Sequence, residues 1–172
     1  MSGGNGQDAA PLGRAFLWLA ALGLLAGLTF LFQAADRDRG RQLSGLDDSG
    51  RAMVVLERDR SGHYLAEGAV NGHAMMFLVD TGATDVAIPE QTARAIGLSF
   101  GPEVGVMTAA GPVTAWRTRL DRVQIGGLVL ENVRALITRG PMREALLGMS
   151  FLRHFSLSQD GGQLIIGTGE TG

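Results

Sequence analysis

The sequence Phe77-Leu78-Val79-Asp80-Thr81-Gly82-Ala83-Thr84 runs from an apolar segment directly into a polar turn. The apolar residues before Asp80 are typical of a buried β-strand, and Gly82 allows the chain to turn without a clash from a Cβ atom. Asp80 is therefore expected at the tip of a loop that a rigid sheet holds in place. Asp-Thr-Gly is common in ordinary turns, so the tripeptide alone does not identify a functional site.

Two further segments accompany this turn. Residues 106–113, Val-Met-Thr-Ala-Ala-Gly-Pro-Val, place small residues between β-forming residues, which indicates a hairpin with little side-chain bulk at its tip. Residues 144–152, Glu-Ala-Leu-Leu-Gly-Met-Ser-Phe-Leu, form a largely apolar run around a glycine. We expect Gly148 to permit close backbone approach to the loop that carries Asp80.

These three segments, in this order, resemble the retropepsin-like aspartic proteases, and the match covers roughly residues 52–168. Residues 146–152 are most similar to the bacterial, membrane-anchored branch of that family. The resemblance implies a mainly β, single-lobe retropepsin-like fold, which is a closed β-barrel with one or two short helices. Viral members commonly carry Arg after the glycine that corresponds to Gly148, where this chain has Met149. The resemblance therefore leaves the dimer contacts undefined.

The catalytic residues that the resemblance implies are Asp80, Thr81 and Gly82, with the Thr81 hydroxyl reaching the opposite loop of a homodimer. The chain is too short for two protease lobes, so the second carboxylate should come from a second copy. Asp48-Ser49-Gly50 is a second motif of similar composition. We reject it as the missing partner, because residues 43–47 before it do not read as a strand and the setting is a linker.

Other residues are assigned to substrate binding or support. Those expected beside a peptide substrate are Ala83, Thr84 and Asp85 in the loop and Thr108, Ala109, Ala110 and Gly111 in the hairpin, which would close as a flap. Those expected to support the site by packing, without a chemical role, are Leu146, Leu147 and Gly148. Trp116 is expected either to line a specificity pocket or to belong to the core or the dimer surface.

The implied chemistry is hydrolysis of a peptide bond. Two carboxylates held close together cannot both be ionised, so the pair retains one proton. The ionised Asp80 would draw a proton from a bridging water, while the protonated one would hydrogen-bond the carbonyl oxygen of the substrate. No metal or organic cofactor is required. Activity is expected on the acidic side of neutral pH, where the singly protonated pair exists.

Composition narrows the functional classes. The formal net charge is −2, with 15 basic residues, all of them Arg, against 17 acidic ones, so no basic field points to nucleic acid. There is no cysteine, which removes disulfides, thiol nucleophiles and thiolate metal sites. The three histidines, His63, His73 and His154, lack the spacing of a metal cluster.

Residues 15–35 are almost entirely apolar and carry no charge. A run of this length spans the bilayer as a helix, and we expect a single-pass anchor in the cell membrane. A cleaved signal peptide is the alternative, but residues 32–35, Phe-Gln-Ala-Ala, place bulky side chains where cleavage needs small ones. The count of Arg residues on the two flanks favours a cytoplasmic domain, whereas the short leading tail favours export. We expect a periplasmic or extracytoplasmic domain.

The chain is expected to consist of a tail (1–14), the anchor (15–35), a linker (36–51), the protease domain (52–168) and a C-terminal tail (169–172). Residues 1 to about 50 are expected to be dispensable for folding, since no strand pattern precedes Met53. The strands are expected at residues 53–56, 63–70, 73–79, 86–88, 113–120, 123–125, 128–137, 155–158 and 164–166, with turns at Asn71-Gly72, Gly126-Gly127 and Asp160-Gly161-Gly162 and a helix at 89–97.

A different functional class fits the same residues. A membrane-tethered module that binds peptides or assists assembly, without catalysis, would need the fold but not the acid, and Asp80 would then only cap a turn. Fold analogy does not decide between the two classes.

Overall fold

A computed structural model of the chain describes residues 24, 40–108, 111–140 and 142–169. The chain divides into two compact units, Met1–Arg39 and Gly40–Gly172, and all the strands and helices named below belong to the second. The expected anchor at residues 15–35 lies outside the described residues, apart from Leu24. Within the described residues, no helix has the length and hydropathy needed to cross a bilayer.

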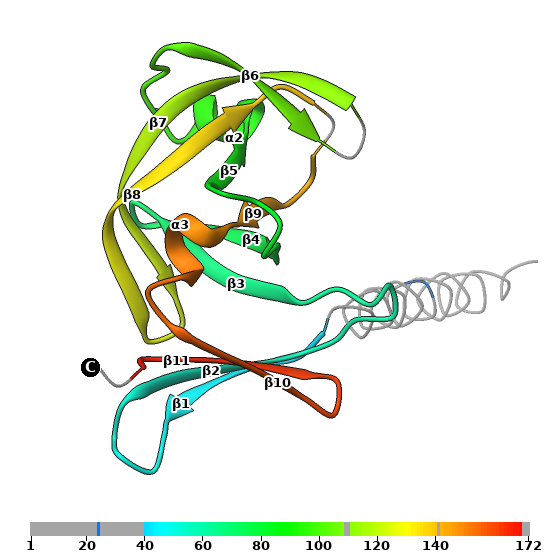
Figure 1. The fold of residues 1–172 in the computed structure, drawn as a ribbon, viewed down its shortest axis with the longest axis vertical. Coiled ribbons are helices and arrows are strands. Elements are labelled where there is room, and N and C mark those ends of the chain that lie inside the picture. Colours follow the sequence, from blue (N-terminus) through cyan, green and yellow to red (C-terminus); the bar gives the residue numbers. More distant parts are fainter. Residues whose placement is uncertain (1–23, 25–39, 109–110, 141, 170–172) are drawn as a thin grey trace, which may run out of the picture. The chain divides into compact units, whose positions relative to one another are not determined.

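Six strands close into a barrel (Figure 1). In order around the barrel they are β3 (Leu65–Val70), β4 (His73–Val79), β9 (Ala145–Leu147), β5 (Val86–Pro89), β8 (Leu128–Thr138) and β7 (Gly111–Ile125), which pairs again with β3. The strand β6 (Glu103–Thr108) extends the same sheet outward from β7. The pairs β4–β9 and β5–β8 are parallel. The predicted mainly β, closed barrel is confirmed.

A separate four-stranded sheet lies at the end of the domain opposite the β6–β7 hairpin (Figure 1). Its strands, in order, are β1 (Gln42–Leu46), β2 (Ala52–Glu57), β11 (Gln163–Gly167) and β10 (Ser156–Asp160). Strand β2 turns Val54 and Leu56 inward, and β11 does the same with Leu164 and Ile166, so that the sheet shares one hydrophobic core with the barrel.

The expectation that residues 43–47 form no strand is wrong. Residues Gln42–Leu46 pair with β2 along their whole length, from Gln42 opposite Leu56 to Leu46 opposite Ala52. The side chains of β1 are largely exposed, so its sequence carries no alternation of buried and exposed residues. Pairing with a preformed neighbour, rather than intrinsic propensity, makes this segment a strand. Asp48-Ser49-Gly50 is the turn of the resulting hairpin, which agrees with its rejection as a catalytic loop.

The local turn and helix signals agree with the structure in most places. Asn71 and Gly72 both have positive φ, 49° and 84°, as a tight two-residue hairpin requires. Helix α2 (Glu90–Ala95) follows Pro89 and ends before Gly97, whose φ is 71°. The segments expected as two strands at 113–120 and 123–125 form one continuous strand, β7, because β8 pairs with it almost throughout.

Strand β9 and the short helix α3 (Met149–Leu152) hold the loop after β4 from behind. The N–H of Asp80 donates to the carbonyl of Leu147 at 3.2 Å, and the N–H of Met149 donates to the carbonyl of Ala83 at 2.8 Å. Between them, Gly148 lies so close to the loop that an added Cβ would be 2.3 Å from the carbonyl oxygen of Asp85. The predicted close approach at Gly148 is confirmed.

Strand β1 gives the first testable expectation. A chain that begins at Gly40 retains β1, whereas one that begins at Ala52 leaves β2 as an unpaired edge. We expect the unfolding temperature of the shorter chain to be lower by roughly 5 °C or more, since a loss of 1 kcal/mol shifts it by a few degrees in a domain of this size. Thermal unfolding followed by circular dichroism measures the difference. Equal unfolding temperatures would show that β1 adds nothing to stability.

The close contact at Gly148 gives the second testable expectation. Gly148→Ala should destabilise the domain by about 1–3 kcal/mol, because the new methyl group overlaps backbone atoms that only a shift of the loop can move. Gly45→Ala in β1 is the matched control, since a Cβ there has no neighbour within 4 Å. Urea titration of both variants makes the comparison. If both variants unfold at the same urea concentration as the parent chain, the loop does not depend on this contact.

Candidate active site

Asp80 follows the last residue of β4 and lies at the start of the loop, with its side chain half-buried. Its Oδ1 accepts the N–H of Gly82 at 2.9 Å, and its carbonyl accepts the N–H of Ala83 at 3.2 Å. Within the described residues, no hydrogen bond reaches the other carboxylate oxygen, Oδ2. Asp80 is therefore fixed by its own turn and keeps one oxygen available to a ligand.

The residues after Asp80 expose their side chains to solvent and bind the rest of the domain through their backbone. Thr81 and Gly82 are exposed, and the described residues provide no partner for the Thr81 hydroxyl. The side chain of Thr84 is also exposed and makes no hydrogen bond to Asp80 within the described part of the chain, while its carbonyl accepts the N–H of Ser150 at 2.8 Å. The loop thus presents hydroxyl groups outward while its carbonyl groups face α3.

Asp85, expected beside the substrate, lies in an ion pair. Its Oδ1 is 3.1 Å from Nη2 of Arg134 on β8, although the two groups lack the alignment of a hydrogen bond. In the part of the chain that the structure describes, that oxygen has no other partner. Asp85 is mostly buried, with 22% of its side chain exposed, whereas Arg134 is half exposed. This pair connects the end of the loop to the barrel wall.

Ser150 is a structural residue of the site that the sequence analysis did not single out. Its buried hydroxyl accepts the N–H of Val86 at 2.9 Å and donates to the carbonyl of Arg134 at 2.8 Å. It therefore joins α3 to β5 and β8 directly behind the loop. The feature of the sequence that could have identified Ser150 is its position as a hydroxyl residue within the apolar run of residues 146–152. Leu147 is fully buried and Leu146 partly so.

The predicted flap is a hairpin of β6 and β7. Thr108 pairs with Gly111, and its hydroxyl donates to the Gly111 carbonyl at 2.7 Å, while Gly111 has a φ of 108°. Ala109 and Ala110 lie outside the described residues. Next to the tip, Met107 has 78% of its surface exposed. Among the described residues, β6 is the last strand of its sheet and pairs with β7 alone, so its outer edge offers free backbone groups.

An aromatic pair with two arginines stabilises the base of the hairpin. Trp116 lies edge-on to Phe100, with ring centroids 5.3 Å apart, and Arg139 lies over the Trp116 ring. Trp116 therefore packs at this base and does not line the groove described below.

A hydrogen bond from Arg94, together with a weaker one from Arg139, lowers the pKa of Glu90. This contribution to stability is present at neutral pH and is lost as the pH falls through that lowered pKa.

The hairpin turn at Asp48-Ser49-Gly50 has no catalytic features. The carboxylate of Asp47 accepts bonds from the hydroxyl of Ser49 and from the backbone N–H of Arg51. These bonds hold the pKa of Asp47 well below its usual range. Asp47 is thus a satisfied turn residue.

A groove of about 690 Å³ lies beside the loop. Thr84 and Asp85 form one side, residues 104–106 of β6 form another, and β7 and β8 form the floor. It therefore connects the end of the Asp80 loop with the flap. The side chains of Arg117, Arg119 and Arg134 line it.

Comparisons with known proteins agree with this geometry. Residues 66–154 match the family model described as gag-polyprotein putative aspartyl protease. An uncharacterized Sinorhizobium protein is 32% identical over 83% of this chain and 67% of its own length. An uncharacterized protein of Rickettsia prowazekii is 30% identical over 59% of this chain and 45% of its own length. The chain thus spans about two thirds of the first relative and under half of the second.

Among solved structures, the crystal structure of a retropepsin-like aspartic protease from Rickettsia conorii is 27% identical, with a TM-score of 0.57. The likeness covers 75% of this chain and 94% of that protein. It extends beyond the segment that the family model matches. From the family match at residues 66–154 and from this shared fold, we conclude that the chain belongs to the retropepsin-like aspartic protease family.

Proposed function

We propose that the chain is an aspartic endopeptidase that hydrolyses peptide bonds as a homodimer, with one Asp80 from each chain. The observation that supports this most directly is the form of the Asp80 loop. One carboxylate oxygen is held by the N–H of Gly82 and the other has no protein partner within the described residues. Such a carboxylate is positioned for chemistry but is only half of the acid–base pair that the reaction needs.

In the proposed reaction, a water molecule lies between the two Asp80 side chains. The ionised carboxylate takes a proton from this water as its oxygen attacks the peptide carbonyl carbon, and the protonated carboxyl of the partner subunit's Asp80 donates to the carbonyl oxygen. The tetrahedral intermediate then collapses as the leaving nitrogen gains a proton and the C–N bond breaks. The products are a carboxylic acid and an amine, and no cofactor takes part.

The substrate is expected to bind as an extended strand. The free edge of β6 can donate and accept backbone hydrogen bonds, and the small residues expected at the flap tip would let it close over the peptide. Ala83 and Thr84 lie at the loop surface where this strand would pass. In the dimer, Thr81 is proposed to donate its hydroxyl to the opposite loop, which would account for its exposure in one chain.

We also propose that residues 15–35 anchor the chain in a membrane, with the protease domain outside the cytoplasm. The support for this part is the uncharged apolar run itself. Confinement to a membrane raises the effective concentration of the two chains and so favours pairing without new contacts.

A module that binds peptides without cleaving them is the second candidate. The bond from the Gly82 N–H to Asp80 Oδ1 is an ordinary turn interaction that needs no catalysis. In this reading, the groove and the flap would still hold a peptide, but the second carboxylate would be unnecessary.

Replacement of the acid separates the two candidates. Asp80→Asn keeps the size of the side chain and the bond to Gly82, so the fold should be retained, while peptide cleavage should fall by about 10³-fold or more. Asp48→Asn, in the Asp-Ser-Gly turn between β1 and β2, is the matched control and should leave cleavage unchanged. The test is peptide hydrolysis by the purified full chain in detergent. Cleavage that survives in Asp80→Asn would remove the aspartic mechanism.

The dimer makes a separate prediction. Below the dimerisation constant, the rate should rise more steeply than linearly with chain concentration, and excess Asp80→Asn chains should inhibit the parent protein by forming mixed dimers. Thr81→Ala should raise the dissociation constant of the dimer, since the bracing hydroxyl is gone, and Thr81→Ser should restore it. Analytical ultracentrifugation with parallel rate measurements provides both quantities. A rate strictly proportional to concentration, with a monomeric mass under active conditions, contradicts the dimer.

A further inference from the structure

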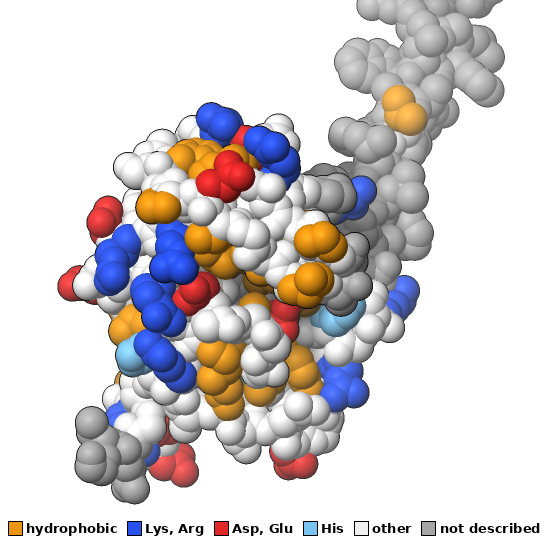
Figure 2. Space-filling model, turned by 45° about the horizontal axis from the view of Figure 1, so that its top comes forward, with side chains coloured by type: hydrophobic (Ala, Val, Ile, Leu, Met, Phe, Trp, Pro, Cys, Tyr) orange, Lys and Arg blue, Asp and Glu red, His pale blue; other side chains and the backbone are white. Residues whose placement is uncertain are grey.

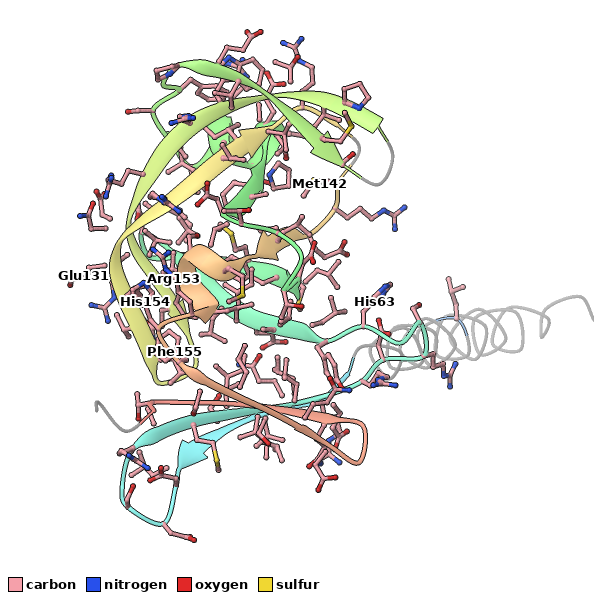
Figure 3. All side chains as sticks on the ribbon, in the orientation of Figure 1. His63, Glu131, Met142, Arg153, His154 and Phe155 are labelled. Atoms are coloured by element: carbon pink, nitrogen blue, oxygen red, sulfur yellow. The ribbon has the colours of Figure 1, made fainter. Side chains whose placement is uncertain are left out.

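Four arginines lie close together on the face of the barrel beside the Asp80 loop. Arg117, Arg119 and Arg134 line the groove, and Arg119 and Arg134 also line an adjoining pocket of about 270 Å³ together with Arg153. We call these four residues the arginine strip. Figure 2 shows arginine side chains gathered on one face with a carboxylate beside them. Figure 3 labels Arg153 and His154, which follow α3, and Glu131 of β8, and all three line the adjoining pocket.

The strand register places these charges together. Arg117 and Arg119 are two residues apart on β7 and therefore project from the same face of the sheet. Arg119 lies directly opposite Arg134 in the β7–β8 pairing. Like charges at directly opposed positions destabilise a sheet unless something compensates them. The opposed arginines therefore indicate a function that outweighs the destabilisation of the sheet.

The protein compensates this charge only in part. Arg134 pairs with Asp85, and Arg119 donates to the neutral side chain of Asn132 at 2.8 Å. Within the described residues, the guanidinium groups of Arg117 and Arg153 have no protein partner, and the only other acid in the two pockets is Glu131. The strip thus carries an excess of positive charge on a chain whose net charge is −2.

Position connects the strip to the proposed chemistry. The groove begins at Thr84 and Asp85, at the end of the Asp80 loop, and passes beneath residues 104–106 of the flap. A peptide held beneath β6 would therefore place side chains from one end of its sequence into the groove. Val104, Val106 and Leu136 provide apolar contacts for the methylene groups of such a side chain.

We propose that the arginine strip selects the substrate by binding its acidic side chains, so that cleavage favours peptides with Asp or Glu at a fixed distance from the broken bond. This inference rests on the proposed protease function. The guanidinium group suits a carboxylate because its planar fork donates two parallel hydrogen bonds. Arg117, at the flap end of the strip and without a partner among the described residues, makes the principal contact, and Arg134 is shared between Asp85 and the substrate.

The test uses the full chain in neutral detergent and a peptide library whose cut products are identified by mass spectrometry. Asp and Glu should be enriched at one position relative to the cut. For a matched pair of peptides with Glu or Gln there, Arg117→Gln should reduce the preference for Glu by about tenfold, as expected for loss of one charge-assisted hydrogen bond. Arg117→Glu should turn the preference toward Lys or Arg. Added salt should weaken the preference of the parent protein.

Arg122→Gln is the control, because Arg122 is an exposed arginine on the same strand but outside both pockets. It should leave the ratio of the two rates unchanged. Absence of any acidic enrichment, or an identical cleavage profile for Arg117→Glu and the parent chain, overturns the proposal while leaving the protease function intact.

A binding measurement keeps the proposal testable if the chain cleaves no peptide. Fluorescence anisotropy with labelled Glu and Gln peptides, on the Asp80→Asn chain, should show tighter binding of the Glu peptide, and Arg117→Gln should abolish that difference. Equal binding of both peptides contradicts the proposal. So does a strip that binds vesicles of phosphatidylglycerol in an Arg117-dependent manner but discriminates no peptide, because that result assigns the charge to a membrane surface.

Discussion

The close backbone contact between Gly148 and the loop after β4 is the constraint on which the rest of the site depends. Only a residue without a side chain can lie this near to the carbonyl groups of Ala83 and Asp85. The contact lets β9 and α3 pack against the loop and form two backbone hydrogen bonds with it. The N–H of Met149 donates to the carbonyl of Ala83, and the N–H of Asp80 donates to the carbonyl of Leu147. Ser150 then extends this support to β5 and β8. The loop is thereby fixed mainly through its backbone, while the side chains of Thr81 and Thr84 remain exposed.

The same arrangement leaves several polar groups of the Asp80 loop without partners in a single chain. The scaffold satisfies the backbone of the Asp80 loop but contributes no hydrogen bond to Oδ2 of Asp80 or to the hydroxyl of Thr81 within the described residues. Thr81 is exposed and Asp80 is half-buried, and within the described residues the outer edge of β6 is also unpaired. A second chain and an extended peptide together would supply partners for all three. The proposed dimer and the proposed substrate therefore follow from the same unsatisfied groups.

The sequence predicted those parts of the structure that depend on local chemistry. Gly148 acts through its missing side chain and the Asn71-Gly72 turn through its positive φ angles, and both features are visible in residue type alone. Strand β1 was missed because its exposed side chains carry no periodic pattern and its order comes from β2. The arginine strip was missed because Arg119 and Arg134 meet only through the register of β7 and β8, which no short stretch of sequence specifies.

The stoichiometry of inhibitor binding tests the central claim, that two chains share one active site, most directly. A peptide with a statine-type hydroxyl in place of the scissile carbonyl would occupy the position of the bridging water between the two Asp80 carboxylates. Calorimetric titration of the full chain in detergent, with native mass spectrometry of the complex, counts the inhibitor and the chains together. The account predicts one inhibitor molecule for every two chains, and no binding to the Asp80→Asn chain. One inhibitor bound to each monomeric chain would contradict it.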